Sequence, residues 1–291
     1  MKISKKLNYS KALSSYFFLG TLAIFIGLGV GTCLASAVDV NNFSKLEEAI
    51  GDNSSSTINI KADSITLGQE LPVINRSLTI SGEAGGSILN GNDKYKILTF
   101  SKDSDDINIS NIHFQNGHSN DPTNNQGSYT FTKQSGSIID PFSSNGGGSV
   151  LIKEGTTIAF NNTNFSNNTA LYNGGAICSE GNIHNKSTLR FNVKTTFSGN
   201  KSNDGNGGAI AVAHSNLIFG GETKFENNKS SDSGGAIFLH SPNGGGSLVI
   251  FEGTASFSGN RGGDYAGAIF SLGSHDKEKN IFVFNGKTTF S

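Results

Sequence analysis

The stretch "FSGNKSNDGNGGAIAVAHSNLIFGGETKFENNKSSDSGGAIF" runs from Phe197 to Phe238 and decides the fold of this protein. It contains the same two motifs twice, a Phe-x-x-Asn followed shortly by a Gly-Gly-Ala-Ile. Self-similarity at a fixed period is the signature of a repeat protein. One unit of roughly 30 residues cannot bury its own apolar face, but stacked units can. The sequence therefore predicts a stack of similar units.

The two motifs keep a nearly constant offset through four copies. Phe-x-x-Asn begins at Phe165, Phe197, Phe225 and Phe257, in steps of 32, 28 and 32 residues. Gly-Gly-Ala-Ile begins 9, 10, 9 and 9 residues after these Phe residues, and the fourth copy has Ala266 in place of its first Gly. The motif residues are Phe165, Asn168, Gly174, Gly175, Ala176, Ile177, Phe197, Asn200, Gly207, Gly208, Ala209, Ile210, Phe225, Asn228, Gly234, Gly235, Ala236, Ile237, Phe257, Asn260, Gly267, Ala268 and Ile269.

An alternating stretch precedes the later Phe-x-x-Asn copies. "LIFGGETKF", "VIFEGTASF" and "FVFNGKTTF" each place two Phe residues six positions apart, with Gly221, Gly253 or Gly286 between them. Apolar and polar residues that alternate around a glycine predict two short strands joined by a turn. Together with the strand that starts at the Gly-Gly-Ala-Ile, each unit is expected to contain three short strands.

Stacking in register explains why the same residues recur. Each residue then lies about 4.8 Å from its own copy in the next unit, which is the spacing of hydrogen-bonded strands. Phe stacks on Phe and Ile on Ile inside, and Asn forms an amide ladder at a corner. Asn also tolerates the left-handed backbone that such corners require, while the Gly pair allows a bend and Ala fits a narrow interior point. We predict an all-β, right-handed parallel β-helix.

Residues 1–37 have the pattern of a cleavable export signal. Basic residues start the chain, an apolar run follows from Tyr16 to Val30, and the small residues Ala35 and Ala37 mark a cleavage site. Two alternatives stay open, a membrane span and lipidation of Cys33. After cleavage the chain retains a single cysteine, Cys178, which cannot form an internal disulfide and is either buried or an exposed thiol able to pair with another chain.

The rest of the chain divides into three parts. Residues 38–120 are interpreted as an N-terminal cap and the first coils, with the cap within residues 38 to about 80. Residues 121–148 are polar, rich in Gly, Ser and Asn, and lack a period, so they are expected to form a loop. Residues 149–291 carry the repeats, and the last unit stops at "KTTFS" before a closing cap.

Composition and motif spacing give little support for catalysis. The net charge of −1 does not indicate binding to nucleic acid. The six His residues lack metal-ligand spacing, although His214 and His240 are placed so that they could lie on neighbouring coils. Adjacent residues of a strand point to opposite faces, so neither of the acidic pairs Glu47-Glu48 and Asp105-Asp106 is an obvious catalytic dyad, and both pairs are expected in solvated loops. We expect no catalytic residues, no metal and no cofactor.

Tandem Gly-Gly-Ala-Ile and Phe-x-x-Asn copies after an export signal resemble the polymorphic outer-membrane proteins of chlamydiae. The resemblance extends from about Val38 to the end and is most specific from Phe165 onward. It implies a virulence-associated autotransporter, in which a secreted β-helical passenger is displayed at the cell surface by a C-terminal β-barrel. It also implies adhesion to a host cell-surface protein or glycan, an association of the motif copies with that activity, and self-association through the repeats.

The chain departs from this family pattern because no barrel follows the last unit. It is expected to be either a fragment or a truncated gene product, and without a barrel it should be found in the periplasm or aggregated rather than at the cell surface. Two other hypotheses remain. The chain could be a polysaccharide lyase or hydrolase built on a β-helix, or an inactive truncated relic. Carboxylates clustered in one groove would favour the enzyme.

Overall fold

The computed structural model describes residues 36–102, 104–119, 146–241, 244–273 and 279–291. The predicted signal lies outside the described residues, apart from Ser36 and Ala37, which begin the first strand. The predicted polar loop lies outside them as well, apart from residues 146–148. Within the described residues, no helix has the length and apolar character that a bilayer crossing requires.

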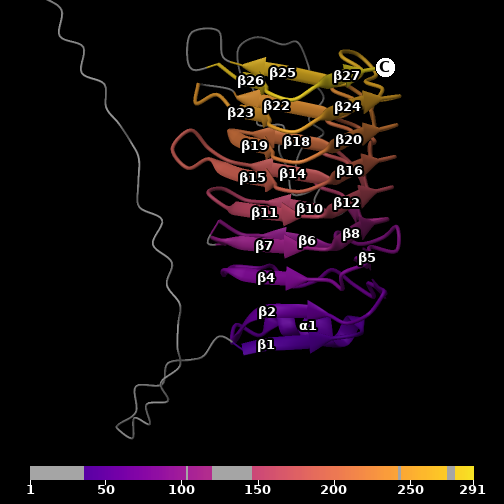
Figure 1. The fold of residues 1–291 in the computed structure, drawn as a ribbon, viewed down its shortest axis with the longest axis vertical. Coiled ribbons are helices and arrows are strands. Elements are labelled where there is room, and N and C mark those ends of the chain that lie inside the picture. Colours follow the sequence, from indigo (N-terminus) through magenta and orange to yellow (C-terminus); the bar gives the residue numbers. More distant parts are fainter. Residues whose placement is uncertain (1–35, 103, 120–145, 242–243, 274–278) are drawn as a thin grey trace, which may run out of the picture. The chain divides into compact units, whose positions relative to one another are not determined.

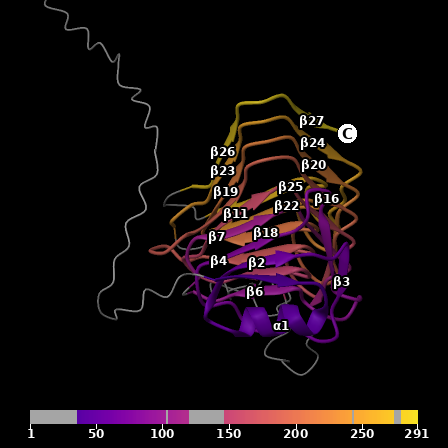
Figure 2. The same ribbon diagram turned by 60° about the horizontal axis from the view of Figure 1, so that its bottom comes forward.

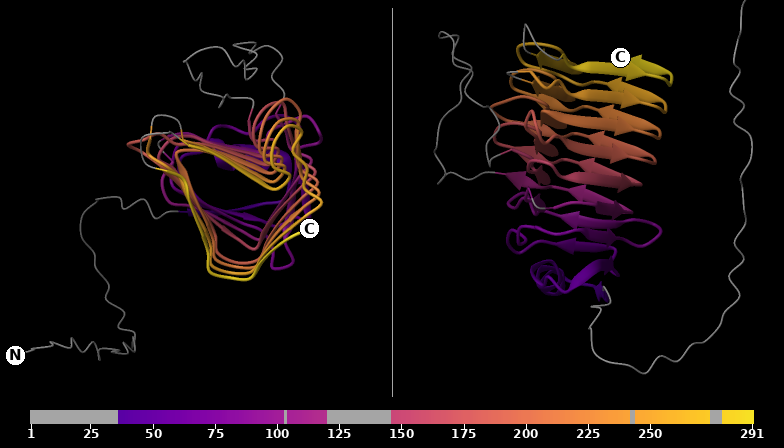
Figure 3. Two further views of the ribbon diagram at one scale, coloured as in Figure 1. Left: turned by 90° about the horizontal axis from the view of Figure 1, so that it is seen from above. Right: turned by 90° about the vertical axis from the view of Figure 1, so that its left-hand side faces the viewer.

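The described chain winds into stacked coils whose strands form parallel sheets (Figure 1). Seen from above, successive coils superimpose around a common interior (Figure 3). Every strand pairing is parallel, and each joins one coil to the next. The predicted parallel β-helix is therefore confirmed.

Each sheet takes one strand from successive coils. Sheet 1 consists of β1 (Ser36–Val40), β2 (Ser55–Ile60), β4 (Leu78–Ser81), β7 (Ile107–Ser110), β11 (Thr157–Asn161), β15 (Ser187–Phe191), β19 (Ser215–Phe219), β23 (Leu248–Phe251) and β26 (Ile281–Phe284). Sheet 2 consists of β3 (Ser64–Thr66), β5 (Ser87–Asn90), β8 (Ile112–Gln115), β12 (Thr163–Ser166), β16 (Thr195–Ser198), β20 (Thr223–Glu226), β24 (Ala255–Ser258) and β27 (Thr288–Phe290). Sheet 3 consists of β6 (Leu98–Phe100), β10 (Val150–Ile152), β14 (Ile177–Glu180), β18 (Ile210–Ala213), β22 (Ile237–Ser241) and β25 (Ile269–Gly273).

A fourth sheet corrects the expectation of three strands per unit. It consists of the two-residue strands β9 (His118–Ser119), β13 (Thr169–Ala170), β17 (Lys201–Ser202) and β21 (Lys229–Ser230). These strands lie between the Asn of one motif and the glycines of the next, where two residues are too few to show an alternating pattern in the sequence.

Two columns of stacked phenylalanines fill the interior between sheets 1 and 2. The first Phe of each Phe-x-x-Asn stacks on its copy, with ring centroids 4.8 Å apart for Phe165–Phe197 and for Phe197–Phe225. A second column on sheet 1 includes Phe191 and Phe219, 4.8 Å apart. The columns meet edge to face, with the rings of Phe191 and Phe197 5.5 Å apart. Offset-stacked and edge-to-face contacts are the favoured aromatic geometries, so each new coil extends both columns.

A helix not predicted from the sequence, α1 (Phe43–Gly51), lies at the N-terminal end of the stack (Figure 2). The side chain of Asn42 caps it by accepting a hydrogen bond from the backbone N–H of Lys45 at 3.0 Å. Leu46, Ala49 and Ile50 are its buried residues, and their spacing of three and four is the signal that could have revealed it. Glu47 and Glu48 therefore lie on a helix and not, as expected, in a solvated loop.

Candidate binding surface and the motif corners

The asparagine of each Phe-x-x-Asn forms a continuous ladder along one corner of the stack. Its side-chain N–H donates to the side-chain oxygen of the next copy at 2.9 Å, from Asn168 to Asn200, from Asn200 to Asn228 and from Asn228 to Asn260. The same oxygen also accepts a backbone N–H, as Asn200 accepts that of Asn168 at 3.1 Å. The second side-chain N–H of Asn200 donates to the carbonyl of Phe165 at 3.0 Å. The predicted amide ladder is confirmed.

The ladder asparagine was predicted to adopt the left-handed conformation at this corner. The structure shows that the residue before it does so instead. Asn167, Gly199, Asn227 and Gly259 have φ of 55°, 63°, 55° and 61°. Asn and Gly are the residues that adopt this conformation most easily. The turn is made one position early because the ladder asparagine must keep its side chain directed inward, where it is fully buried in Asn168, Asn200 and Asn228.

The two glycines of Gly-Gly-Ala-Ile have different structural roles. The first is left-handed, with φ of 68°, 67° and 67° at Gly174, Gly207 and Gly234. The second lies against the next coil, where a Cβ on Gly208 would be 2.1 Å from the carbonyl oxygen of Gly235. In the fourth copy Ala266 keeps the left-handed backbone, with φ of 48°. The predicted bend is confirmed.

The motif residues predicted to be associated with adhesion lie mostly inside the protein. All those of the first three copies are buried, and so is Phe257 of the fourth, whereas Asn260, Gly267, Ala268 and Ile269 are partly or largely exposed on the last coils. The buried copies therefore shape the corners. The surface that a partner can contact consists of the outward side chains and the loops between the strands.

Three residues singled out in the sequence lie on sheet 3 or directly after one of its strands. Cys178 is fully buried, in an apolar cluster separate from the main core that includes Leu151, Ala211 and Phe238. Cys178 therefore points away from the main core that holds Ile177, and of the two alternatives left open by the sequence its thiol is the buried one. His214 and His240 lie on neighbouring coils, and the backbone N–H of His214 donates to the carbonyl of His240 at 3.3 Å.

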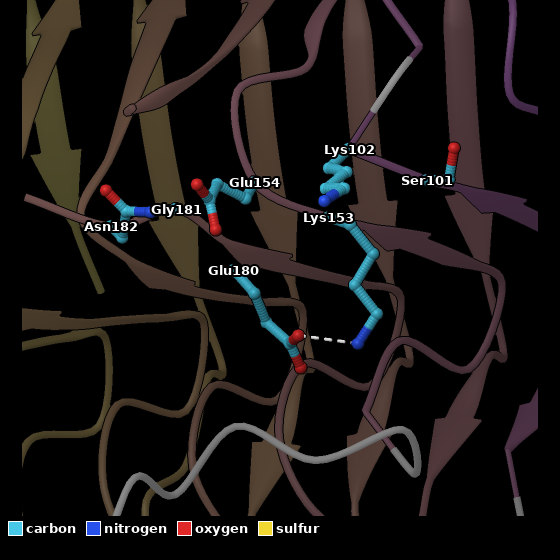
Figure 4. Close-up of a pocket in the computed structure, with 7 residues that line it drawn as sticks. All are labelled: Ser101, Lys102, Lys153, Glu154, Glu180, Gly181 and Asn182. Atoms are coloured by element: carbon cyan, nitrogen blue, oxygen red, sulfur yellow. Dashed lines mark hydrogen bonds and ion pairs between the residues drawn. The ribbon is translucent and has the colours of Figure 1, made fainter. Parts of the chain in front are cut away.

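A hollow of ≈ 430 Å³ lies where the ends of β10 and β14 lead into the following loops (Figure 4). Lys153 and Glu180, on successive coils, form an ion pair of 2.6 Å across it. The hollow is lined by Ser101, Lys102, Lys153, Glu154, Glu180, Gly181 and Asn182. Of the two carboxylates in the hollow, that of Glu180 is thus already paired with Lys153, and this ion pair links two coils.

The described part of the chain contains no group of three or more His, Cys, Asp or Glu side chains that could hold a metal ion. Asp105 and Asp106 are both exposed, in agreement with a solvated loop. The two pairs of acidic residues from the sequence are not brought together, because Glu47 and Glu48 belong to α1 at the N-terminal end of the stack.

A column of cations was missed in the sequence. Lys201 pairs in register with Lys229, and Lys229 with Arg261, so that the three side chains project from successive coils along sheet 4 and its continuation. All three are exposed. The signal is present in the sequence, because the fourth residue after the motif Phe is Lys, Lys and Arg in the last three copies.

Comparison with known proteins agrees with this architecture. The family model of the Chlamydia polymorphic membrane protein repeat matches residues 162–180, 194–213 and 222–239, each running from a Phe-x-x-Asn through the following Gly-Gly-Ala-Ile. A search of curated proteins found no match. The family consists of proteins associated with the chlamydial outer membrane. Three repeats of this chain, in the stack described above, thus match the repeat of the Chlamydia polymorphic membrane protein family, which supports its placement in that family.

Proposed function

We propose that this chain is a non-catalytic adhesive passenger, displayed at the cell surface, that attaches the bacterium to a host cell. The observation that supports this proposal best is that buried and outward-facing residues have separate roles within each coil. The motif residues of the first three copies are buried and hold the coils in register. The outward positions are thereby presented in straight columns on a rigid lateral surface.

Multivalent contact is the mechanism that such a surface supports. When several weak contacts are held on one rigid body, each contact after the first is effectively intramolecular, so the overall affinity exceeds that of any single contact. Successive coils provide equivalent outward positions about 4.8 Å apart. The stack thus supplies repeated sites without needing a deep pocket.

Attachment of the purified chain to host epithelial cells tests the adhesive function. Fluorescent beads coated with the chain should bind cells in a saturable manner, and soluble chain should compete for binding. Beads coated with thermally denatured chain provide the control. Equal binding of native and denatured chain, or no competition by soluble chain, would contradict the proposal.

A polysaccharide lyase or hydrolase is the second candidate, because the hollow in Figure 4 contains Glu154 and Glu180. Acid–base cleavage of a glycosidic bond needs two carboxyl groups placed on either side of it. We expect the chain to release no reducing ends or unsaturated sugars from acidic and neutral polysaccharides, with or without calcium. Product release that is lost in the double variant Glu154→Gln, Glu180→Gln would instead establish an enzyme.

A further inference from the structure

Three exposed cations form a straight column on the side of the stack. Lys201 on β17 and Lys229 on β21 are register partners, and Arg261 is the register partner of Lys229 one coil further on. Thr169 on β13 occupies the same position one coil before Lys201. Because parallel coils are about 4.8 Å apart, the three charges follow one line along the axis of the stack.

No acid neutralises this cation column within the described part of the chain, where none of its three side chains forms an ion pair. The acids close in sequence are Glu226 on β20 and a column of aspartates, Asp204, Asp232 and Asp264, each three residues after a cation.

Asp232, in the middle of the aspartate column, is influenced by the two other aspartates. Burial, and then the charges of Asp264 and Asp204, raise the pKa of the Asp232 carboxyl. A nearby cation would lower that pKa, because it would stabilise the ionised form. Among the described residues, no ion pair joins the aspartates to the cation column.

We propose that the column of Lys201, Lys229 and Arg261 binds a linear anionic polysaccharide that lies along the axis of the stack. A straight row of like charges held by a rigid backbone is complementary to an extended polymer with anionic groups at regular intervals. Additional coils would cover only the end of the stack, so this lateral column stays accessible whatever the number of coils. The inference rests on the proposed adhesive function and gives the chemical class of its partner.

Binding to immobilised heparin, a sulfated polysaccharide, tests the cation column directly. The triple variant Lys201→Gln, Lys229→Gln, Arg261→Gln should bind about tenfold or more weakly, because it loses three charge contacts. The matched control Lys94→Gln, Lys194→Gln, Lys287→Gln removes the same charge at exposed positions elsewhere, and it should bind like the original chain. Equal losses in the two triple variants would overturn the proposal.

A gain of binding provides a second test that does not depend on loss of a side chain. Thr169→Lys adds a fourth charge to the column at the register position of Lys201 and should bind heparin about threefold more tightly. Thr254→Lys adds the same charge at an exposed position outside the column and should leave the affinity unchanged. Equal affinities of these two variants would count against the column.

Other probes identify the chemistry that is recognised. Hyaluronan carries carboxylates without sulfates, so column-dependent binding to heparin alone assigns sulfate, and column-dependent binding to both assigns any regularly spaced anion. Single-stranded DNA of the same length should bind more weakly than heparin. If DNA binds equally well through the same residues, the column attracts any polyanion and the assignment to a polysaccharide is wrong.

The two proposals can fail separately. If heparin binds through the column but the coated beads do not attach to cells, the polysaccharide site stands and the adhesive function is wrong. If the beads attach to cells while heparin binding is absent or independent of the column, the adhesive function stands and this inference is wrong.

Discussion

A single buried asparagine holds three coils together at each step of the ladder. The amide of Asn200 uses both of its donors, one on Phe165 and one on Asn228, and its oxygen accepts two N–H groups of Asn168. Both N–H donors and the oxygen of this fully buried side chain are thereby hydrogen-bonded. Leaving a buried donor or acceptor without a partner costs about 1–3 kcal/mol, so each amide matters to two neighbouring coils.

Replacing Asn200 with alanine should lower the free energy of unfolding by roughly 3–5 kcal/mol, because several buried groups lose their partner at once. Urea unfolding followed by circular dichroism measures the change. The control is Asn192→Ala, since Asn192 donates to Asn161 at 3.0 Å in an exposed ladder on sheet 1. It should cost less than about 0.5 kcal/mol. Similar costs for the two variants would show that burial of the ladder is not what stabilises the corner.

At the residue scale, the sequence predicted the contacts between copies better than the backbone conformation. Stacking in register forces like residues together, so the Asn168–Asn200 contact and the Phe165–Phe197 stack follow from spacing alone. The left-handed position does not follow, because register leaves open which residue of a corner turns. Asn167 and Gly199 share that position without sharing a side chain. The cation column was not predicted, because its residues lie directly after the Phe-x-x-Asn motif and belong to neither of the two motifs.

At the scale of the element, the close approach of backbones at the second glycine fixes how tightly a coil closes. The Cα of Gly208 faces the backbone of the next coil, where a Cβ would be 2.1 Å from Gly235 O and 2.5 Å from Lys229 N. These atoms belong to the backbone of sheet 4 and its loop, so they cannot move aside as a flexible side chain would. Only a residue without Cβ fits.

Gly208→Ala should therefore destabilise the chain by about 3 kcal/mol or more, through strain that spreads into β18 and β21. Gly85→Ala is the matched control, because no atom lies within 4 Å of the position of its Cβ, and it should be neutral or stabilise by up to about 1 kcal/mol. Thermal unfolding of both variants compares them. If Gly208→Ala unfolds at the same temperature as Gly85→Ala, the close approach is not a constraint in solution.

Besides the two-residue strands of sheet 4, sequence analysis missed an element that does not repeat. Helix α1 occurs once, and its last turn is held by Arg76, whose guanidinium donates to the carbonyls of Ile50 and Ala49 at 2.8 and 3.0 Å. These are the carbonyls that a helix end leaves without an intrahelical partner. A search for repeated motifs cannot find such an element, although its N-cap and its apolar spacing are both visible in the sequence.

At the scale of the whole molecule, each coil contacts chiefly the coils before and after it. Strand pairing, the Asn ladder and both Phe columns all join neighbours, and the ion pair between Lys153 and Glu180 does the same. Stability in such a stack is approximately a sum over units and their interfaces. One coil should therefore be removable without loss of the fold, provided that the two exposed interfaces match each other.

Deleting residues 198–225 removes one complete coil of 28 residues and joins Phe197 to Glu226. Asn168 then meets Asn228, and Thr169 meets Lys229, so the ladder and sheet 4 continue. We expect a folded β protein whose urea m-value is lower by roughly a tenth, since 28 of 291 residues are lost and the m-value scales with the surface exposed on unfolding. Deleting only residues 198–211 joins Phe197 to Val212, which places a sheet 3 residue at the Asn corner, and this chain should not fold. If circular dichroism shows both deletion variants equally unfolded, the coils are not independent units and the additive stack is the wrong description.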